Sequence, residues 1–431
     1  MQEEFLHYLW KFRLFDGKDP VTQSGEPIEI IKTGEHNFDS GPDFFNARIK
    51  IGETEWAGNV EIHTKASDWE AHKHQHDKAY DNVILHVVHT ADKELKRRNG
   101  EVIPTLELKK RVPVEVYKKY QSLGTSGDWI PCGKQISSVS SFTLNHWLDR
   151  LLIERLERKT QPIIDSLAKN QNDWEETFYQ QLAYGFGLKV NAQPFEFLAK
   201  SLPLNILSKQ KDSLLSIEAL LFGQSGLLDP NAKDEYEKQL RKEYAFLKNK
   251  FKLKPMDAHL WKFARLHPPG FPTIRIAQFA NLIFKSLNLF SKMIEAQNIY
   301  TVQSLLHAEA SEYWNTHYRF GKVSPHRKKF LGEDTKSNLI INVIAPFLFV
   351  YAKQKGEPRI TDRALDFLNK TEAENNSIIE KWNSLGVETE NSGQTQALLQ
   401  LKNDYCSKKR CLQCAIGAKL LHPSPSLSLG V

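Results

Sequence analysis

The chain has 431 residues, of which 40% are hydrophobic and 26% charged, so its composition is that of an ordinary soluble protein of about two or three domains. The formal net charge of +6 permits contact with nucleic acid but does not require it. Four cysteines are too few for a disulfide scaffold. The opening MQEEFLHYLWKF lacks the features of a signal peptide, and no uninterrupted apolar run reaches the roughly 18 residues that cross a bilayer. We therefore expect a cytoplasmic protein with no membrane partner.

The first part of the chain carries the signals of an α/β domain. Apolar residues at helical spacing predict a helix over 3–15, and Ser67 and Glu70 have the spacing of a capping box, which predicts a second helix over 68–80. Alternating or β-branched runs predict strands over 27–31, 44–51, 55–64, 83–90 and 103–108. The expected order is helix, three strands, helix and two strands.

The pattern changes near residue 135, where leucine and lysine at helical spacing replace β-branched alternation. Helices are predicted over 141–170, 173–186, 193–222, 232–252, 273–297, 337–355 and 360–370. The sequence therefore predicts two domains. Residues 1–135 form an α/β domain with a mixed sheet and flanking helices, and residues 136–431 form an all-α region with a cysteine-containing end.

Two acidic residues stand on neighbouring strands of the first domain. Asp43 precedes the strand 44–51, and Glu61 lies on the strand 55–64, so a hairpin between them can bring both carboxylates to one end of the sheet. Converging carboxylates suit a hard cation such as Mg²⁺ or Mn²⁺, which can generate hydroxide and polarise a phosphodiester. The structural alternative is that Asp43 caps a turn and Glu61 pairs with Arg48 across the hairpin.

An acid after a proline, an acid-x-base triplet on the next strand, and then a helix and a buried strand resemble the PD-(D/E)xK nuclease superfamily. The resemblance implies that Asp43 and Glu61 bind the metal, with the backbone carbonyl of Ile62 as a further ligand. The lysine of that family is replaced by His63, which can act as a general base near neutral pH. Alternation places Lys65 on the same face, where it could supply the missing ammonium.

The resemblance also makes Glu3 or Glu4 a candidate, because in several branches of the superfamily an acid of the first helix joins the metal site. The longer string GPDFFNARI…WAGNVEIH…HDKAYDNVILHVV resembles an uncharacterised bacterial family, as does the C-terminal segment. That second resemblance implies no activity.

The predicted function is metal-dependent phosphodiester hydrolysis of DNA or RNA. The alternative is a nuclease fold without catalysis that acts as a nucleic-acid-binding or assembly module. The departure at His63 favours the alternative, and the two acids favour the enzyme.

Three histidines follow the triplet. On a helix, His72 and His76 would share a face and could hold zinc as a pair, but no third ligand has suitable spacing, and His74 would point elsewhere. The alternative is a partly exposed polar helix packed on the sheet. His86, inside VILHVV, is expected to be a hydrogen-bonded core residue.

The C-terminal segment carries Cys406-x4-Cys411-x2-Cys414, with His422 eight residues later. Three thiols and an imidazole are a ligand set for zinc, and the basic run 408–410 would lower the pKa of the thiols. The alternative is that the cysteines are ordinary helical core.

Overall fold

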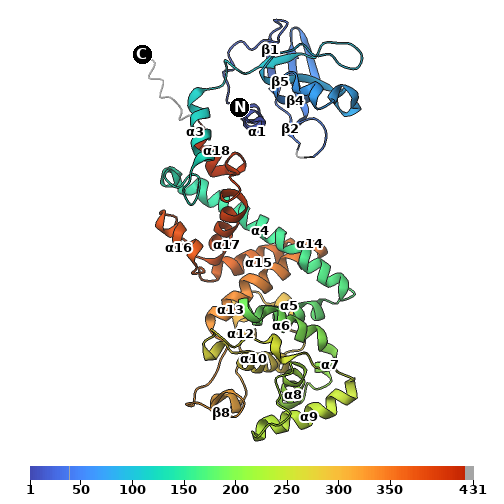
Figure 1. Cartoon of the computed structure of the whole chain (residues 1–431), viewed down its shortest axis with the longest axis vertical. Helices are drawn as coiled ribbons and strands as arrows, with labels where there is room; N and C mark the ends of the chain where they lie inside the picture. The colour runs from blue at the N-terminus through green and yellow to red at the C-terminus, as the bar shows by residue number, and fades with distance from the viewer. Residues whose placement is uncertain (38, 423–431) are drawn as a thin grey trace. The chain divides into compact units, whose positions relative to one another are not determined.

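The computed structural model describes residues 1–37 and 39–422, which form two compact units (Figure 1). The first unit joins Met1–Trp147 to Lys402–Val431, and the second is Leu148–Leu401. The chain enters the second unit inside helix α4 (Ser141–Lys169). The cysteine-containing end therefore belongs with the α/β unit, whereas the sequence placed it with the helical region.

The first unit is built on a six-stranded mixed sheet in the order β1-β3-β4-β5-β6, with β2 paired to β3. Strands β1, β3 and β4 are antiparallel neighbours, and β5 lies parallel to both β4 and β6. The strands are β1 (Ile28–Lys32), β2 (Glu35–His36), β3 (Phe44–Ile51), β4 (Thr54–Lys65), β5 (Val83–Thr90) and β6 (Thr105–Glu107). The predicted mixed sheet is thus confirmed, and each predicted strand has a counterpart in it.

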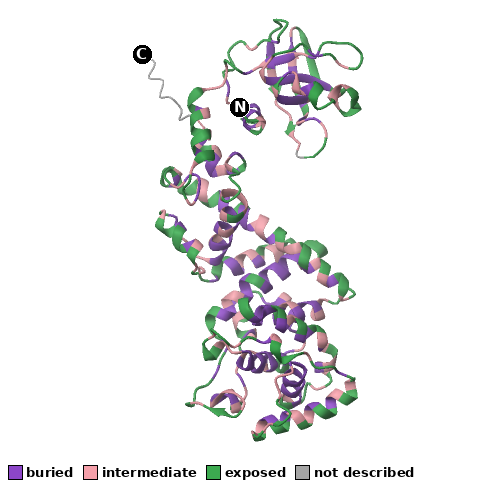
Figure 2. Ribbon diagram, in the orientation of Figure 1, coloured by how far each residue is buried: buried purple, intermediate pink, exposed green. Residues whose placement is uncertain are grey.

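Strand β5 is a central strand because its sequence VILHVV is apolar on both faces. Its first six residues are all buried, and the strands of the sheet are largely in the colour of buried residues in Figure 2. Trp69, Leu95 and Ile103 are also buried and pack in one cluster with Val83 and Val88. Burial of each such apolar side chain stabilises the fold by about 1.5–3 kcal/mol. The burial of β5 therefore holds the neighbouring strand β4 in place in the sheet.

Helix α1 (Glu3–Phe12) is shorter than the predicted 3–15 because Arg13 takes the left-handed conformation, with φ of 52°. Its buried residues are Phe5, Leu6, Tyr8, Leu9 and Trp10, whereas Phe12 is 40% exposed. The indole Nε1 of Trp10 donates to the carbonyl of Thr33 at 3.0 Å. This anchoring fixes His7, which lies on the same helix.

The prediction of one helix over 68–80 is wrong. Helix α2 covers only Asp68–Ala71, and two 3-10 turns follow at His74–His76 and Lys78–Tyr80. Ser67 does not cap the helix, because its hydroxyl donates to Asp92 Oδ2 at 2.7 Å. Lys73 then takes a left-handed conformation, with φ of 63°, which stops the helix and turns the chain.

The C-terminal segment packs against α3 (Val114–Thr125) through α18 (Ala415–Leu421). Lys402 Nζ donates to the carbonyl of Trp129 at 2.9 Å, and Lys409 Nζ donates to that of Gly124 at 2.6 Å. Helix α1 also takes part, since Tyr8 Oη donates to the carbonyl of Ala418 at 3.2 Å. These contacts bring the end of the chain back to the first unit. A π-helical turn (Leu401–Cys406) and 3-10 turns (Ile136–Ser138 and Cys411–Gln413) complete the segment and its surroundings.

The second unit is helical, as predicted, with a small hairpin of β7 (His317–Arg319) and β8 (Lys322–Val323). Its helices after α4 are α5 (Trp174–Phe186), α6 (Leu188–Ser201), α7 (Leu204–Ser208), α8 (Leu214–Gln224), α9 (Glu235–Phe251), α10 (Pro272–Lys285), α11 (Leu289–Glu295), α12 (Ile299–Leu305), α13 (Glu333–Leu339), α14 (Ala345–Lys355), α15 (Pro358–Lys370), α16 (Ser377–Ser384) and α17 (Ser392–Gln400). The predicted helix 193–222 is divided in three because Pro203 begins α7 and Ser213 caps α8. Shorter 3-10 turns lie at Ala258–Leu260, Pro268–Gly270 and Glu312–Asn315.

One stretch of the described residues, Glu333–Lys355, has the length and composition of a membrane-crossing helix. A π-helical turn, Ile340–Ile344, interrupts it between α13 and α14. Of its most apolar window, 78% is buried inside the second unit. The stretch therefore has the burial of a core helix.

Candidate functional site

Asp43 and Glu61 face each other across β3 and β4. Phe44 pairs with Val60, so the residues one step further out, Asp43 and Glu61, are opposite one another. Asp43 Oδ2 accepts the backbone N–H of Ile62 at 2.8 Å, and Glu61 Oε2 accepts the backbone N–H of Asp43 at 3.1 Å. Each carboxylate is thus held by the other strand, and the two are brought together as the sequence predicted.

A β-bulge sets this register. Between Phe44 and Ala47 the pairing of β3 with β4 shifts by one residue, and Asn46 inside the bulge has φ of 56°. Because side chains alternate along a strand, a one-residue shift decides which face a side chain joins. The bulge therefore aligns Asp43 with Glu61.

The alternative pairing of Glu61 with Arg48 is not formed. Arg48 instead bonds Glu55 on β4, with Nε 2.8 Å from Glu55 Oε1, at the exposed end of the hairpin. Glu61 is only 4% exposed and lies among site residues. The acidic pair is therefore not explained by a surface ion pair.

Helix α1 adds a histidine and an acid to the pair. His7 Nε2 lies 3.3 Å from Asp43 Oδ2, and the half-buried Glu3 interacts electrostatically with both residues. Burial lowers the pKa of His7, but the neighbouring carboxylates, led by Asp43, outweigh it and raise the net pKa. Of the two acids proposed on the first helix, Glu3 is thus at the site, whereas Glu4 is exposed and interacts with Cys411.

Two histidines lie beside the other oxygen of Glu61, and a third contacts one of them. Glu61 Oε1 lies 3.5 Å from His63 Nε2 and 3.3 Å from His74 Nε2. His63 Nε2 is in turn 3.1 Å from His72 Nδ1. One ring nitrogen each from His63, His72 and His74 lies within 4.8 Å of the other two, which is the spacing of metal ligands. We call these three residues the histidine cluster.

The broken helix explains the geometry of the histidine cluster. A continuous helix would have placed His72 and His76 on one face and turned His74 away. The left-handed Lys73 reverses this arrangement, so that His74 stacks on Tyr80 at 3.8 Å between ring centroids and points to Glu61, while His76 is exposed. The third ligand that the sequence spacing did not reveal is His63, supplied by β4.

His86 is a buried core residue, as predicted, and its Nε2 shares a hydrogen bond of 2.8 Å with His63 Nδ1. The parallel register of β4 and β5 places it beside Glu61. His86 thus fixes the ring orientation of His63 from behind the site.

Burial controls the protonation of the site. It raises the pKa of the Glu61 carboxyl far above the usual range, and the charge of Asp43 adds to the effect. Burial and the neighbouring imidazoles lower the pKa of His63, and burial with the charge of His74 lowers that of His86 to about 3. The inner histidines are therefore neutral at pH 7, which is the form that binds metals.

Lys65 lies apart from the acidic pair. It is exposed, its charge acts on Asp92, and its backbone N–H donates to Asp68 Oδ2 at 2.8 Å. Among the described residues, its side chain forms no hydrogen bond or ion pair with Asp43 or Glu61. Ile62, by contrast, has its backbone at the site through its bond to Asp43.

The cysteines form no comparable group among residues 1–37 and 39–422, since the histidine cluster is the one set of three or more potential ligands within 4.8 Å. His422 packs against Phe12, with 5.8 Å between the ring centroids. The expectation of lowered thiol pKa values is wrong, because burial raises the pKa of Cys411 to about 11 and that of Cys406 further. Cys132, which the sequence did not link to this segment, is near enough to Cys411 and Cys414 to be affected by their charge.

One cavity adjoins the histidine cluster, and a second lies next to that cavity. One, of about 620 Å³, is lined by residues of 72–80, including His72, His74 and His76. The other, of about 730 Å³, shares His76 and is lined by the basic residues Lys93, Lys96, Arg97 and Arg98 with two glutamates. The cavity beside the cluster thus borders a second cavity whose lining has an excess of positive charge.

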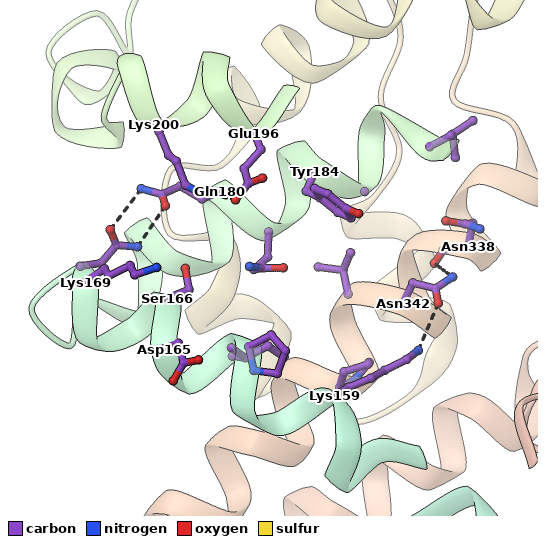
Figure 3. Close-up of a pocket in the computed structure, with 18 of the residues that line it drawn as sticks. Lys159, Asp165, Ser166, Lys169, Gln180, Tyr184, Glu196, Lys200, Asn338 and Asn342 are labelled. Atoms are coloured by element: carbon purple, nitrogen blue, oxygen red, sulfur yellow. Dashed lines mark hydrogen bonds and ion pairs between the residues drawn. The ribbon is translucent and has the colours of Figure 1, made fainter. Parts of the chain in front are cut away.

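A separate cavity of about 1000 Å³ lies in the second unit (Figure 3). Lys159 lies at one end and donates to Asn342 Oδ1 at 3.1 Å, and Lys200 at another part forms an ion pair with Glu196. Burial lowers the pKa of Lys159 to about 7. Lys159 and Lys200 are thus already engaged with neighbours, and the group of potential metal ligands found among the described residues lies in the first unit.

By fold and site, the chain is a mixed-sheet protein with a buried carboxylate–histidine centre and a helical second unit. It belongs to the family described as protein of unknown function DUF2851, whose model matches residues 3–377. The match covers every residue of the site and ends before the cysteine segment. No curated protein and no solved structure matches the chain.

Proposed function

We propose that the first unit hydrolyses phosphodiester bonds of nucleic acid with the help of a divalent metal ion, in the manner of the PD-(D/E)xK nucleases that its motif resembles. The observation that carries the proposal is the opposed pair of Asp43 and Glu61, each tied by a hydrogen bond to the other strand. Two carboxylates held in place near an open surface are the ligand set from which nucleases bind Mg²⁺ or Mn²⁺.

The chemistry that a bound divalent ion supplies is activation of water and stabilisation of charge on the phosphate oxygens. Asp43 and Glu61 hold that ion, and their backbone hydrogen bonds keep them from moving as charge develops. Glu61 has a raised pKa because it is buried, and a cation beside it favours the ionised form that coordinates. A bound cation would stabilise both carboxylates in their ionised form. Without a cation, burial and mutual repulsion disfavour the state in which both are ionised.

The residue beside the reacting water is His7 in this proposal, not His63. His63 is 1% exposed and both of its nitrogens face other side chains, His86 on one side and His72 with Glu61 on the other. His7 lies 3.3 Å from Asp43 and is more exposed, with 15% of its side chain accessible. His63 therefore acts as a ligand or positioning residue rather than as a general base.

The basic surface beside the site suits a nucleic acid substrate. Lys93, Lys96, Arg97 and Arg98 line a cavity that shares His76 with the cavity lined by His72 and His74. Phosphate contacts from such residues supply most of the affinity of proteins for nucleic acids. They favour a polyanionic substrate over a small neutral ester.

The test is a cleavage assay on single- and double-stranded DNA and RNA with Mg²⁺ or Mn²⁺, with EDTA as the blank. We expect the wild type to cleave at least one substrate, and Asp43→Asn and Glu61→Gln each to abolish cleavage. Glu53→Gln is the matched control, because Glu53 is an exposed acid on the turn between the same two strands. Absence of cleavage throughout, or cleavage that survives in both site variants, would show the proposal to be wrong. Retained nucleic acid binding without any cleavage would support the inactive binding module instead.

A further inference from the structure

We infer that the histidine cluster, with Glu61 as its carboxylate ligand, is a binding site for one transition-metal ion of the zinc class. This inference goes beyond the proposed function, because its ion is held by Glu61 and the histidine cluster rather than by Asp43 and Glu61. Its metal-binding claim does not depend on hydrolysis, because binding is measured without any substrate.

The distances match coordination geometry. Zinc binds histidine nitrogen at about 2.0–2.1 Å, so tetrahedral ligand atoms lie about 3.3 Å from one another. The three distances between neighbouring ligand atoms are 3.1 Å for His63 Nε2 to His72 Nδ1, 3.5 Å for His63 Nε2 to Glu61 Oε1, and 3.3 Å for His74 Nε2 to Glu61 Oε1. These atoms already have the spacing of a set that shares one ion.

The type of ligand selects the class of metal. Mg²⁺ and Ca²⁺ prefer oxygen ligands, whereas imidazole nitrogen suits zinc, copper, iron and nickel. A set of three histidines and one carboxylate is therefore a site for a transition metal. The carboxylate oxygen that faces the histidines is Oε1, while Oε2 is bonded to the backbone of Asp43, so the two sides of Glu61 have different neighbours.

One proposed ligand atom, Nε2 of His74, is not used in any hydrogen bond. His74 Nε2 is buried and makes no hydrogen bond, although it lies 3.3 Å from Glu61 Oε1. A buried polar atom without a hydrogen bond destabilises a fold by about 1–3 kcal/mol unless another partner satisfies it. A metal ion bonded to this nitrogen is such a partner.

His86 is in place to orient the proposed ligand His63. Metal-binding histidines use their second ring nitrogen to bond a neighbouring group, which fixes the ring and its tautomer. His63 does so through the 2.8 Å bond from Nδ1 to His86 Nε2. The cavity of about 620 Å³ next to His72 and His74 gives an ion access to the cluster.

The test uses the full chain stripped with chelator and titrated with Co²⁺, whose visible absorption reports nitrogen coordination, and with Zn²⁺ by calorimetry. We expect one ion per chain. His72→Ala and His74→Ala are the informative variants, because both positions are at least partly exposed and their substitution leaves the core intact. Each is expected to weaken binding at least about tenfold, the loss that changing even a partner of a metal ligand causes. His76→Ala is the matched control and should bind like the wild type.

Absence of Co²⁺ absorption, or unchanged affinity in both His72→Ala and His74→Ala, would overturn the inference. The outcomes separate it from the proposed function. Zinc binding that depends on the cluster, without cleavage of any nucleic acid, leaves the inference standing and removes the function. Cleavage with Mg²⁺ by a chain that binds neither Co²⁺ nor Zn²⁺ would support the proposed function and overturn the inference.

Discussion

His63 and His86 share a hydrogen bond of 2.8 Å between neighbouring parallel strands, and both rings are almost fully buried. Since burial and neighbouring groups lower the pKa of each ring, both are neutral at pH 7, and one of the two bonded nitrogens carries the hydrogen. The bond therefore links the tautomer of His63 to that of His86. A residue in the centre of the sheet thus controls the orientation of a ring in the site.

Replacing His86 by phenylalanine removes this bond while keeping an aromatic ring in the core. We expect His86→Phe to weaken Co²⁺ binding about 10- to 100-fold, because His63 loses its fixed orientation. His89→Phe is the control, since His89 lies on the same strand and bonds Thr90 rather than the cluster. Equal affinities of His86→Phe and the wild type would show that His86 is only a packing residue.

The bulge at Asn46 offers a test of the register. Asn46 is exposed and has φ of 56°, a conformation that costs a β-branched residue about 1–2 kcal/mol and costs glycine little. We expect Asn46→Val to lower the free energy of unfolding by about that amount and to reduce cleavage, because Asp43 loses its alignment with Glu61. Asn46→Gly should keep both properties. A valine variant with unchanged stability and activity would contradict this role of the bulge.

Gly58 on β4 lies where no side chain fits. A Cβ at this position would come within 2.4 Å of Ile84 Cγ2 and 2.7 Å of the carbonyl of Asn82. Gly58→Ala should therefore destabilise the first unit by about 1–3 kcal/mol, which a lower melting temperature would report. Gly124→Ala is the control, since a Cβ there meets nothing within 4 Å and alanine favours the helix α3.

Glu218 gives the second unit a pH dependence. It is 1% exposed, its Oε2 accepts from Tyr236 and from Ser311 Oγ at 3.1 Å, and burial raises its pKa from 4.5 to about 7. The folded state therefore holds this proton more tightly than the unfolded state. Stability is greatest below about pH 4.5 and falls as the pH rises to about 7, by about 3 kcal/mol for this group alone.

Glu218→Gln should remove that part of the dependence. In urea unfolding, we expect the glutamine variant to gain stability relative to the wild type at pH 7.5 and to gain little at pH 5. Glu235→Gln, an exposed acid on α9, should show no such difference between the two pH values. A gain of equal size at both pH values would indicate a packing effect rather than a titration.

The sheet and the acidic pair could be predicted from the sequence because both depend on local patterns. Alternation on β3 and β4 indicated the faces of the strands, and the turn between them indicated a hairpin that brings Asp43 and Glu61 to one end of the sheet. The bulge at Asn46 left no clear signal, since asparagine is common in many conformations. The prediction succeeded at the level of strands, although the residue that sets their register was not recognised.

The histidine cluster could not be predicted because it depends on a break in a helix. Ser67 and Glu70 indicated a capped helix, but the hydroxyl of Ser67 bonds to Asp92, which is far along the chain. The left-handed Lys73 then decides where His74 points. The same limit applies at the C-terminus, where the spacing of three cysteines indicated a metal site but could not show how deeply the fold buries them.

The first unit is made from the two ends of the chain, with Leu148–Leu401 synthesised between them. On the ribosome, the strands that carry Asp43 and Glu61 are therefore finished long before the segment that includes α18 and bonds to Tyr8, Gly124 and Trp129. For that whole interval α18 is not yet present to pack against α3. Completion of the first unit thus waits for the synthesis of α18 and is timed by that segment rather than by the folding of the sheet.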